Sequence, residues 1–152
     1  MRKRTPPELA ALRTVFESGD PVPGAVVAAA YAAGGYASGP VPGLELVADS
    51  AQAARRVRSR TRELTFTTAE RTLDMDLVPA RRGFLLATGI VLEHAGAVAL
   101  GSSVVVRHPR GECSGKLDEH GSFRIAGIPR GPISVVLRPG CGAAAGADWL
   151  VC

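Results

Sequence analysis

From Leu44 onward, apolar and polar residues alternate with a period of two, and glycine, proline or aspartate interrupts the alternation every few residues. Side chains of a β-strand point alternately to opposite faces, so each short alternating run predicts a half-buried strand. The runs are LELVAD, RELTFTT, TLDMDLV, FLLATGIVLEH, SSVVVRH, CSGKLD, SFRIAG, PISVVLRPG and DWLVC. Eight or nine short strands with no helix between them predict a mainly β fold, an antiparallel β-sandwich.

The apolar positions of these runs predict the core. The first three runs assign to one face the side chains of Leu44, Leu46, Ala48, Leu64, Phe66, Leu73, Met75 and Leu77. Hydrophobic residues make up 46% of the chain, but much of this share is alanine and valine, and aromatic residues are only 5%. We therefore expect a core built mainly from small and β-branched side chains.

The N-terminal residues show helical spacing instead. TPPELAALRTVFESGD opens with a T-x-x-E capping box and a proline at the first helical position. Leu9, Leu12 and Phe16 then fall on one face, which predicts a helix of about three turns ending near Gly19.

A second helix is expected through PVPGAVVAAAYAA, ending at two glycines. Its apolar stripe consists of Val26, Val27, Ala30 and Tyr31. The sequence thus predicts a helical segment over residues 1–33, a Pro/Gly linker over 34–43 and a β-sandwich over 44–152.

Arginine dominates the basic residues, and its densest cluster is the best candidate for binding a polyanion. The chain has 18 Lys and Arg against 14 Asp and Glu, a net charge of +4. The cluster consists of Arg55, Arg56, Arg58, Arg60 and Arg62. Five guanidinium groups in this stretch can contact phosphates. A solvated loop is the favoured interpretation, because no aromatic residue interleaves with the arginines and no groove-entering helix is evident.

Cysteine usage favours a reducing compartment. Cys113, Cys141 and Cys152 are an odd set without C-x-x-C spacing, whereas small secreted domains usually carry an even set. No Cys/His spacing typical of zinc occurs, so no metal or cofactor is predicted. No apolar run approaches about eighteen residues, and the basic start MRKR is not followed by an apolar stretch. We expect a cytoplasmic protein, with export as the alternative.

Polar clusters suggest no enzyme. Asp74 and Asp76 alternate with apolar residues and are interpreted as the wet face of a strand rather than a cation site. Asp118, Glu119 and His120 crowd one turn, where adjacent residues do not form a nucleophile–base–orienter set. A redox-active Cys113 would need a thiol pKa lowered by nearby positive charge.

A longer motif links the sandwich to a known family. It comprises Thr88-Gly89-Ile90-Val91, then Asp118, Gly121 and Phe123 of a D-x-x-G-x-F turn, then Ile128-Pro129-x-Gly131-Pro132-Ile133. Residues 88–138 thereby resemble the carboxypeptidase regulatory-like group of β-sandwiches, also called transthyretin-like or prealbumin-like. The resemblance departs at EHAGAVALGSS, which replaces the family's longer G-x-P-x-x-G-A connection.

The same turn has a physical interpretation that does not depend on the family. Gly121 supplies a positive φ, and the Asp118 carboxylate accepts hydrogen bonds from turn amides. Phe123, Ile125 and Ile128 are expected to fill the sandwich interior. A following Pro-Arg-Gly corner, residues 129–131, then turns the chain toward the opposite sheet.

Nearly the whole chain resembles a second group, small uncharacterised proteins of high-GC Gram-positive bacteria that are frequently encoded beside alternative sigma factors. The residues that carry this resemblance are LRTVFESGDPVPGAVVAAAYAA, LELVADS and ELTF. It implies a genomic neighbourhood linked to sigma-factor-dependent regulation.

These observations together predict a non-enzymatic protein-interaction or accessory module that requires no cofactor. The apolar face of the first helix, Leu9, Leu12 and Phe16, is the candidate partner-binding surface; the competing interpretation docks that helix on its own sandwich. Two other functions stay open. One is an extracellular sandwich that binds carbohydrate or cell wall, and the other is a basic protein associated with nucleic acid.

Overall fold

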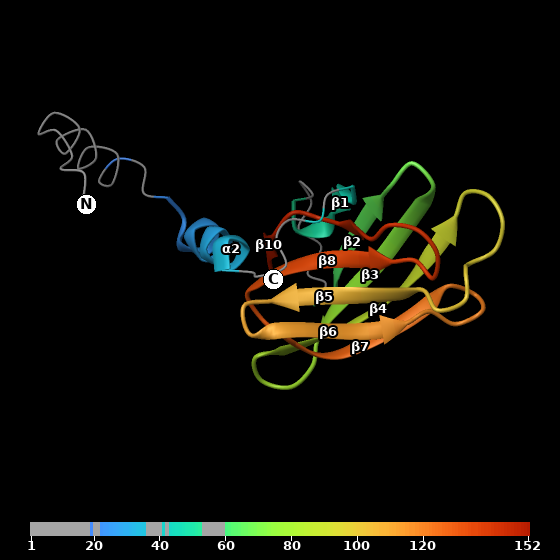
Figure 1. Cartoon of the computed structure of the whole chain (residues 1–152). Coiled ribbons are helices and arrows are strands. Elements are labelled where there is room, and N and C mark those ends of the chain that lie inside the picture. Colours follow the sequence, from blue (N-terminus) through green and yellow to red (C-terminus); the bar gives the residue numbers. More distant parts are fainter. Residues whose placement is uncertain (1–18, 20–21, 36–40, 42, 53–59) are drawn as a thin grey trace, which may run out of the picture.

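The computed structural model describes residues 19, 22–35, 41, 43–52 and 60–152. In these segments the protein is mainly β, with two antiparallel sheets and the helix α2 (Gly24–Gly35) beside them (Figure 1). The first sheet has the order β1-β2-β3-β4-β7, with β1 (Glu45–Asp49), β2 (Arg62–Thr67), β3 (Arg71–Pro79), β4 (Phe84–Glu93) and β7 (Ser122–Pro129). The second has the order β10-β8-β5-β6, with β5 (Ser103–His108), β6 (Gly111–Lys116), β8 (Pro132–Arg138) and β10 (Leu150–Val151); β9 (Ala145–Gly146) also pairs with β8. A 3-10 turn, η1 (Ser50–Gln52), follows β1.

The central strands of the first sheet bury the face that the alternation predicts. Leu64 pairs with Met75 and Phe66 pairs with Leu73 across β2 and β3, and all four side chains are buried. Their outward neighbours are half-buried or exposed. The prediction of two-period strands packed as antiparallel sheets is therefore confirmed here.

The predicted composition of the core is only half right. Among the described residues, the buried apolar side chains are leucine, valine, isoleucine, two phenylalanines and one methionine, with Ala87 as the one alanine. Many alanines lie instead in α2 and in turns. Leucine supplies the volume that alanine cannot, so the core is fuller than the composition suggested.

Strand β1 departs from the predicted face. The register with β2 shifts between Leu46 and Ala48, so β1 has a bulge there. Leu44 is buried and Leu46 is half-buried, but Ala48 is exposed. Because a bulge re-aims the side chains that follow it, the three residues do not share one face as predicted.

Strand β9 was not predicted either. Its two residues lie in the Gly- and Ala-rich stretch between the runs PISVVLRPG and DWLVC, where the alternation predicts no strand, and they pair with Val136 and Leu137 of β8. Two residues are too few to show an alternation.

The β6–β7 turn forms as its residues predict. The Oδ1 atom of Asp118 accepts hydrogen bonds from the backbone N–H groups of His120 and Ser122, each at 2.9 Å. Gly121 has a φ of 80°, and a side chain there would overlap the carbonyl oxygen of Val91. Only glycine combines this backbone conformation with so close an approach.

The same prediction holds for the strand and corner that follow. Phe123, Ile125 and Ile128 of β7 are buried in the core. Gly131, with a φ of 120°, then redirects the chain from β7 in the first sheet to β8 in the second.

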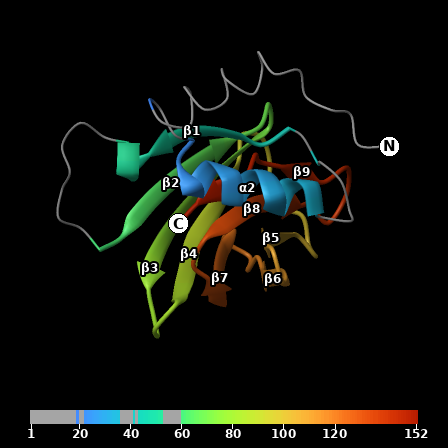
Figure 2. The ribbon, with the colours of Figure 1, turned by 90° about the vertical axis from the view of Figure 1, so that its left-hand side faces the viewer.

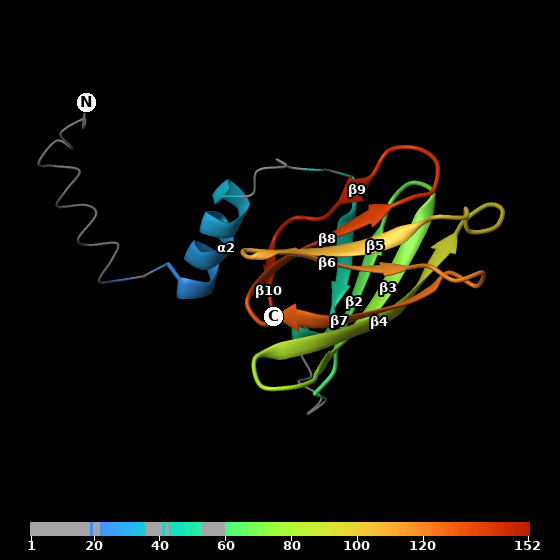
Figure 3. The same ribbon diagram turned by 60° about the horizontal axis from the view of Figure 1, so that its bottom comes forward.

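The turns gather at two opposite ends of the sandwich. Those after β3, β5 and β7 lie together on the left in Figures 1 and 3, and we call this the β3–β4 end. The turns after β2, β4 and β6 lie on the right, and we call this the β2–β3 end. The register agrees: Arg107 lies opposite Ser134, near the end of β5 and the start of β8.

Within the described segments, no helix has the length and apolar character needed to cross a bilayer.

Candidate interaction surface

Helix α2 docks on the second sheet. Cα atoms of α2 approach those of β8 and β10 within 8 Å. Figure 2, which views the molecule from the side of the β3–β4 end, shows α2 lying in front of β8. The sequence left open whether the N-terminal helices dock on the sandwich. Helix α2 lies next to β8 and β10, but of its described side chains only that of Ala29 is half-buried.

The second sheet is buried on both faces at β5 and β8. Val104, Val106 and Val135 belong to the core between the sheets. Val105 and Val136, which alternate with them and so point to the outer face, are at most 1% exposed. The outer face of β5 and β8 is therefore covered as well.

The described side chains of α2 are exposed apart from the half-buried Ala29, and the large ones are apolar. Val22 is 63% exposed, Val26 56%, Val27 40% and Tyr31 79%. We call these four residues the α2 surface. Residues 22–35 carry no charged side chain. A water-exposed helix normally alternates an apolar stripe with charged residues, whereas an uncharged, apolar helix is normally covered.

The predicted partner-binding residues Leu9, Leu12 and Phe16 lie outside the described residues. Their role stays a prediction. The sequence analysis noted an apolar stripe that includes Val26, Val27 and Tyr31 but did not identify it as a candidate interaction surface. The signal that was available is the lack of any charged residue from Val22 to Gly35.

The predicted polyanion cluster is described only in part, since Arg55, Arg56 and Arg58 lie outside the described residues. Arg60 is exposed just before β2. Arg62 is held in an ion pair: its Nε and Nη2 atoms donate to the two carboxylate oxygens of Asp49, at 2.9 and 2.6 Å. Its Nη1 atom donates to the carbonyl oxygen of Val151 in β10, so this guanidinium ties the first sheet to the second.

This ion pair shifts both partners toward their charged forms. The hydrogen bonds from Arg62 lower the pKa of Asp49, whose side chain is only 3% exposed. The same bonds raise the pKa of Arg62. Cys152, 3.3 Å from Nη1 of Arg62, has its pKa raised to about 11 by burial in spite of the nearby cation.

Cys113 lies beside His108, but the pair is not arranged for nucleophilic chemistry. The Sγ atom is 3.6 Å from Nε2 of His108 and 3.6 Å from the carbonyl oxygen of Gly127. Nδ1 of His108 accepts a hydrogen bond from the backbone N–H of Arg110 at 3.3 Å. Burial raises the pKa of Cys113, and burial together with Arg110 lowers the pKa of His108, so both shifts oppose a thiolate–imidazolium pair.

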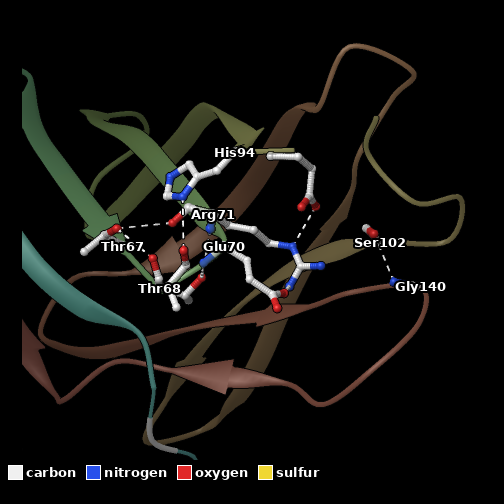
Figure 4. A network of polar contacts seen from close by, with 9 residues as sticks. Thr67, Thr68, Glu70, Arg71, His94, Ser102 and Gly140 are labelled. Carbon is white, nitrogen blue, oxygen red and sulfur yellow. Dashed lines mark hydrogen bonds and ion pairs between the residues drawn. The ribbon is translucent and has the colours of Figure 1, made fainter. Parts of the chain in front are cut away.

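The polar network at the β2–β3 end builds its turn. Figure 4 shows Arg71 beside Glu70 in this network. The Nε atom of Arg71 donates a hydrogen bond to a carboxylate oxygen of Glu93 at 2.6 Å. The hydroxyl of Thr68 accepts hydrogen bonds from the backbone N–H groups of Glu70 and Arg71. Nδ1 of His94 lies 3.2 Å from the carbonyl oxygen of Ala69, in the same turn. These side chains stabilise the local structure of the turn.

An open cleft of about 550 Å³ adjoins this turn, between the start of β1 and β9. Its polar groups are the carboxylates of Glu45 and Asp148 and the hydroxyls of Thr67 and Thr68. Both hydroxyls already hydrogen-bond within the turn. Across the described segments, no three His, Cys, Asp or Glu side chains cluster as metal ligands would. Among the described residues, the cleft therefore presents no arrangement of side chains suited to catalysis or metal binding.

No family model, curated protein or solved structure matches this chain.

Proposed function

We propose that the protein is a non-enzymatic interaction module that binds a partner protein through the α2 surface. The observation that carries the proposal is an uncharged helix docked on a sandwich with Val22, Val26 and Tyr31 more than half exposed. Exposed apolar patches on folded proteins mark interaction sites.

The partner surface should be the apolar face of an amphipathic helix. The α2 surface offers no charge for salt bridges, so binding must come from the burial of apolar area. Ala28 and Ala30, which lie between Val27 and Tyr31 in the chain, are exposed, and such small side chains let a second helix approach closely. The partner helix would lay its apolar face on the α2 surface, as amphipathic helices do in hydrophobic grooves.

The family of the sandwich, the identity of the partner and the cellular location are proposals as well. The D-x-x-G-x-F turn and the Pro-Arg-Gly corner support a sandwich of the carboxypeptidase regulatory-like kind, because their residues perform the turn roles that the motif requires. The second sequence resemblance supports an alternative sigma factor or its regulator as the partner. Cytoplasmic localisation would place the protein with that partner.

The test is photo-crosslinking in native cells from a single position of the α2 surface. A photoreactive residue replaces Tyr31, the most exposed of the four, and a matched control carries it at Arg124 on the outer face of β7. We expect one discrete protein adduct from position 31 and none of the same mass from position 124. The adduct should disappear when Val26→Glu is added.

Two results would contradict the proposal. The first is an adduct from position 31 that maps to residues 1–18 of the same chain, which would mean that the α2 surface is covered from within. The second is an identical adduct pattern with and without Val26→Glu.

A further inference from the structure

The three turns of the β3–β4 end share one sequence pattern, a proline followed by arginine and glycine. They read PARRG at residues 79–83, PRG at 109–111 and PRG at 129–131. The turn arginines are Arg81, Arg82, Arg110 and Arg130. The strands that precede these turns come from both sheets, and nothing in the linear sequence shows that the turns meet.

Contacts hold the turns together. The backbone N–H of Arg130 donates to the carbonyl oxygen of Gly83 at 2.9 Å, which joins the β7–β8 corner to the β3–β4 turn. The Sγ atom of Cys113, near the start of β6, lies 3.6 Å from the carbonyl oxygen of Gly127, near the end of β7. Figures 1 and 3 show all three turns at the same end.

Turn geometry accounts for the glycines but not for the arginines. Gly83, Gly111 and Gly131 have φ values of 77°, 142° and 120°, a range that favours glycine. The residue before each glycine has no such restriction, and many polar residues would serve. Arginine at all three positions therefore asks for another explanation.

The four turn arginines are exposed, and none forms an ion pair with a described residue. Three arginines elsewhere in the fold are paired with a carboxylate instead: Arg62 with Asp49, Arg71 with Glu93, and Arg138 with Glu112. The three turns themselves contain no acidic residue.

The opposite end has the reverse charge. Its β2–β3, β4–β5 and β6–β7 turns contain Glu70, Asp118 and Glu119 and neither arginine nor lysine. The turns at the two ends of the sandwich therefore differ in sign, although the net charge is only +4. A local concentration of one sign steers oppositely charged ligands to that end.

An aromatic ring accompanies the arginines. Phe84 directly follows the first turn, pairs with Pro129 beside the third, and is 39% exposed. An exposed ring beside guanidinium groups offers a surface on which a nucleic-acid base can stack. An acidic peptide would use the guanidinium groups but not the ring, so the ring favours nucleic acid as the ligand.

We propose that the β3–β4 end binds single-stranded nucleic acid. The turn arginines contact the phosphates, and Phe84 stacks on a base. Four arginines on three separate turn tips suit a pliable strand that can follow them, whereas no described helix at this end bears arginines that could enter a duplex groove. The α2 surface carries no charged residue and so supplies none of the phosphate contacts.

The test is fluorescence anisotropy with a labelled oligothymidylate of about twelve nucleotides, within the site sizes seen for single-strand binders. Each phosphate contact contributes about −0.7 to the slope of log K against log salt, so four contacts predict a slope of about −3. Affinity should then fall about 50-fold between about 50 and about 200 mM salt.

The variants assign the site. Removing one arginine from each turn, with Arg82→Gln, Arg110→Gln and Arg130→Gln together, should bring the slope to about −1. The control Lys116→Gln/Arg124→Gln removes positive charge from exposed strand positions and should leave the slope near that of the parent. Phe84→Leu, which keeps the residue apolar, should weaken binding about 5- to 100-fold without changing the slope.

Three results would overturn the proposal. One is undetectable binding at about 50 mM salt, where phosphate contacts are strongest. Another is an equal loss of slope in the control, which would indicate diffuse attraction to net charge. The third is competition by poly-glutamate or by vesicles of anionic phospholipid as effective as that by unlabelled oligothymidylate, which would assign the end to an acidic protein or a lipid surface.

Discussion

Arg62→Met should destabilise the fold by about 2–3 kcal/mol, because it removes both the ion pair with Asp49 inside the first sheet and the hydrogen bond that ties this sheet to the second. Two short charged hydrogen bonds, 2.9 and 2.6 Å, join Arg62 to Asp49, and a third bond reaches the carbonyl oxygen of Val151. Breaking a fully buried pair costs about 3–5 kcal/mol, and breaking an exposed one about 0–1 kcal/mol. The Asp49 side chain is 3% exposed and that of Arg62 is 23% exposed, so the cost lies between these limits.

A second ion pair supplies the matched comparison. Arg138 donates to Glu112 at 3.3 and 3.2 Å, but these side chains are 44% and 40% exposed. Arg138→Met should therefore cost less than about 1 kcal/mol. With a urea dependence of about 1–3 kcal/mol per molar, the two unfolding midpoints should differ by roughly 1 M.

The double variant Asp49→Asn/Arg62→Met distinguishes the cost of losing the Arg62 interactions from the cost of leaving the Asp49 carboxylate buried and unpaired. Arg62→Met alone leaves the Asp49 carboxylate buried without its cation, so removing that charge as well should recover part of the stability. Equal midpoint shifts for Arg62→Met and Arg138→Met would refute the reasoning, because the difference in burial would then have no energetic consequence.

Three further predictions follow from single residues. The lowered pKa of Asp49 means that the folded state binds the proton of this carboxyl less readily than the unfolded state does. The contribution of Asp49 to stability is therefore complete above the ordinary pKa of 3.8 and is lost as pH falls through the folded pKa. Urea midpoints measured across that pH range should fall more steeply for the parent than for Asp49→Asn. Gly121→Ala should cost about 2–4 kcal/mol, since its Cβ would overlap a backbone carbonyl at positive φ, whereas Gly127→Ala, with open space around it, should cost about 1 kcal/mol in the same unfolding assay. Cys141 is exposed and should react with a maleimide at neutral pH, while burial and a pKa of about 11 should keep Cys152 unmodified until the protein unfolds; mass spectrometry of the partly labelled protein distinguishes them, and equal labelling of the two would contradict the account.

The sheets could be predicted from the sequence because period-two alternation depends on each strand alone. Leu64, Phe66, Leu73 and Met75 alternate with polar residues, so the buried face is evident before the partner strand is known. Strand β9 could not be found in this way, because a two-residue strand exists only through its pairing with β8. The β1 bulge is likewise a property of the pair.

The candidate surfaces were harder to predict because they depend on which elements meet. The alternation that locates strands does not show that the turns at residues 79–83, 109–111 and 129–131 lie at one end. The densest arginine cluster drew attention instead, and one of its members, Arg62, proved to be held by Asp49. Exposure of Val26 and Tyr31 was equally hidden, since an apolar stripe has the same spacing whether it faces the core or solvent.

The most direct test of the account is calorimetric titration of the partner identified by crosslinking against the purified protein, at several temperatures and two salt concentrations. Burial of the uncharged α2 surface predicts a negative heat-capacity change and an affinity nearly independent of salt, with at least about 100-fold loss in Val26→Glu. An affinity that falls steeply with salt and is unchanged in Val26→Glu would contradict the account, because the partner would then bind through charge and not through α2.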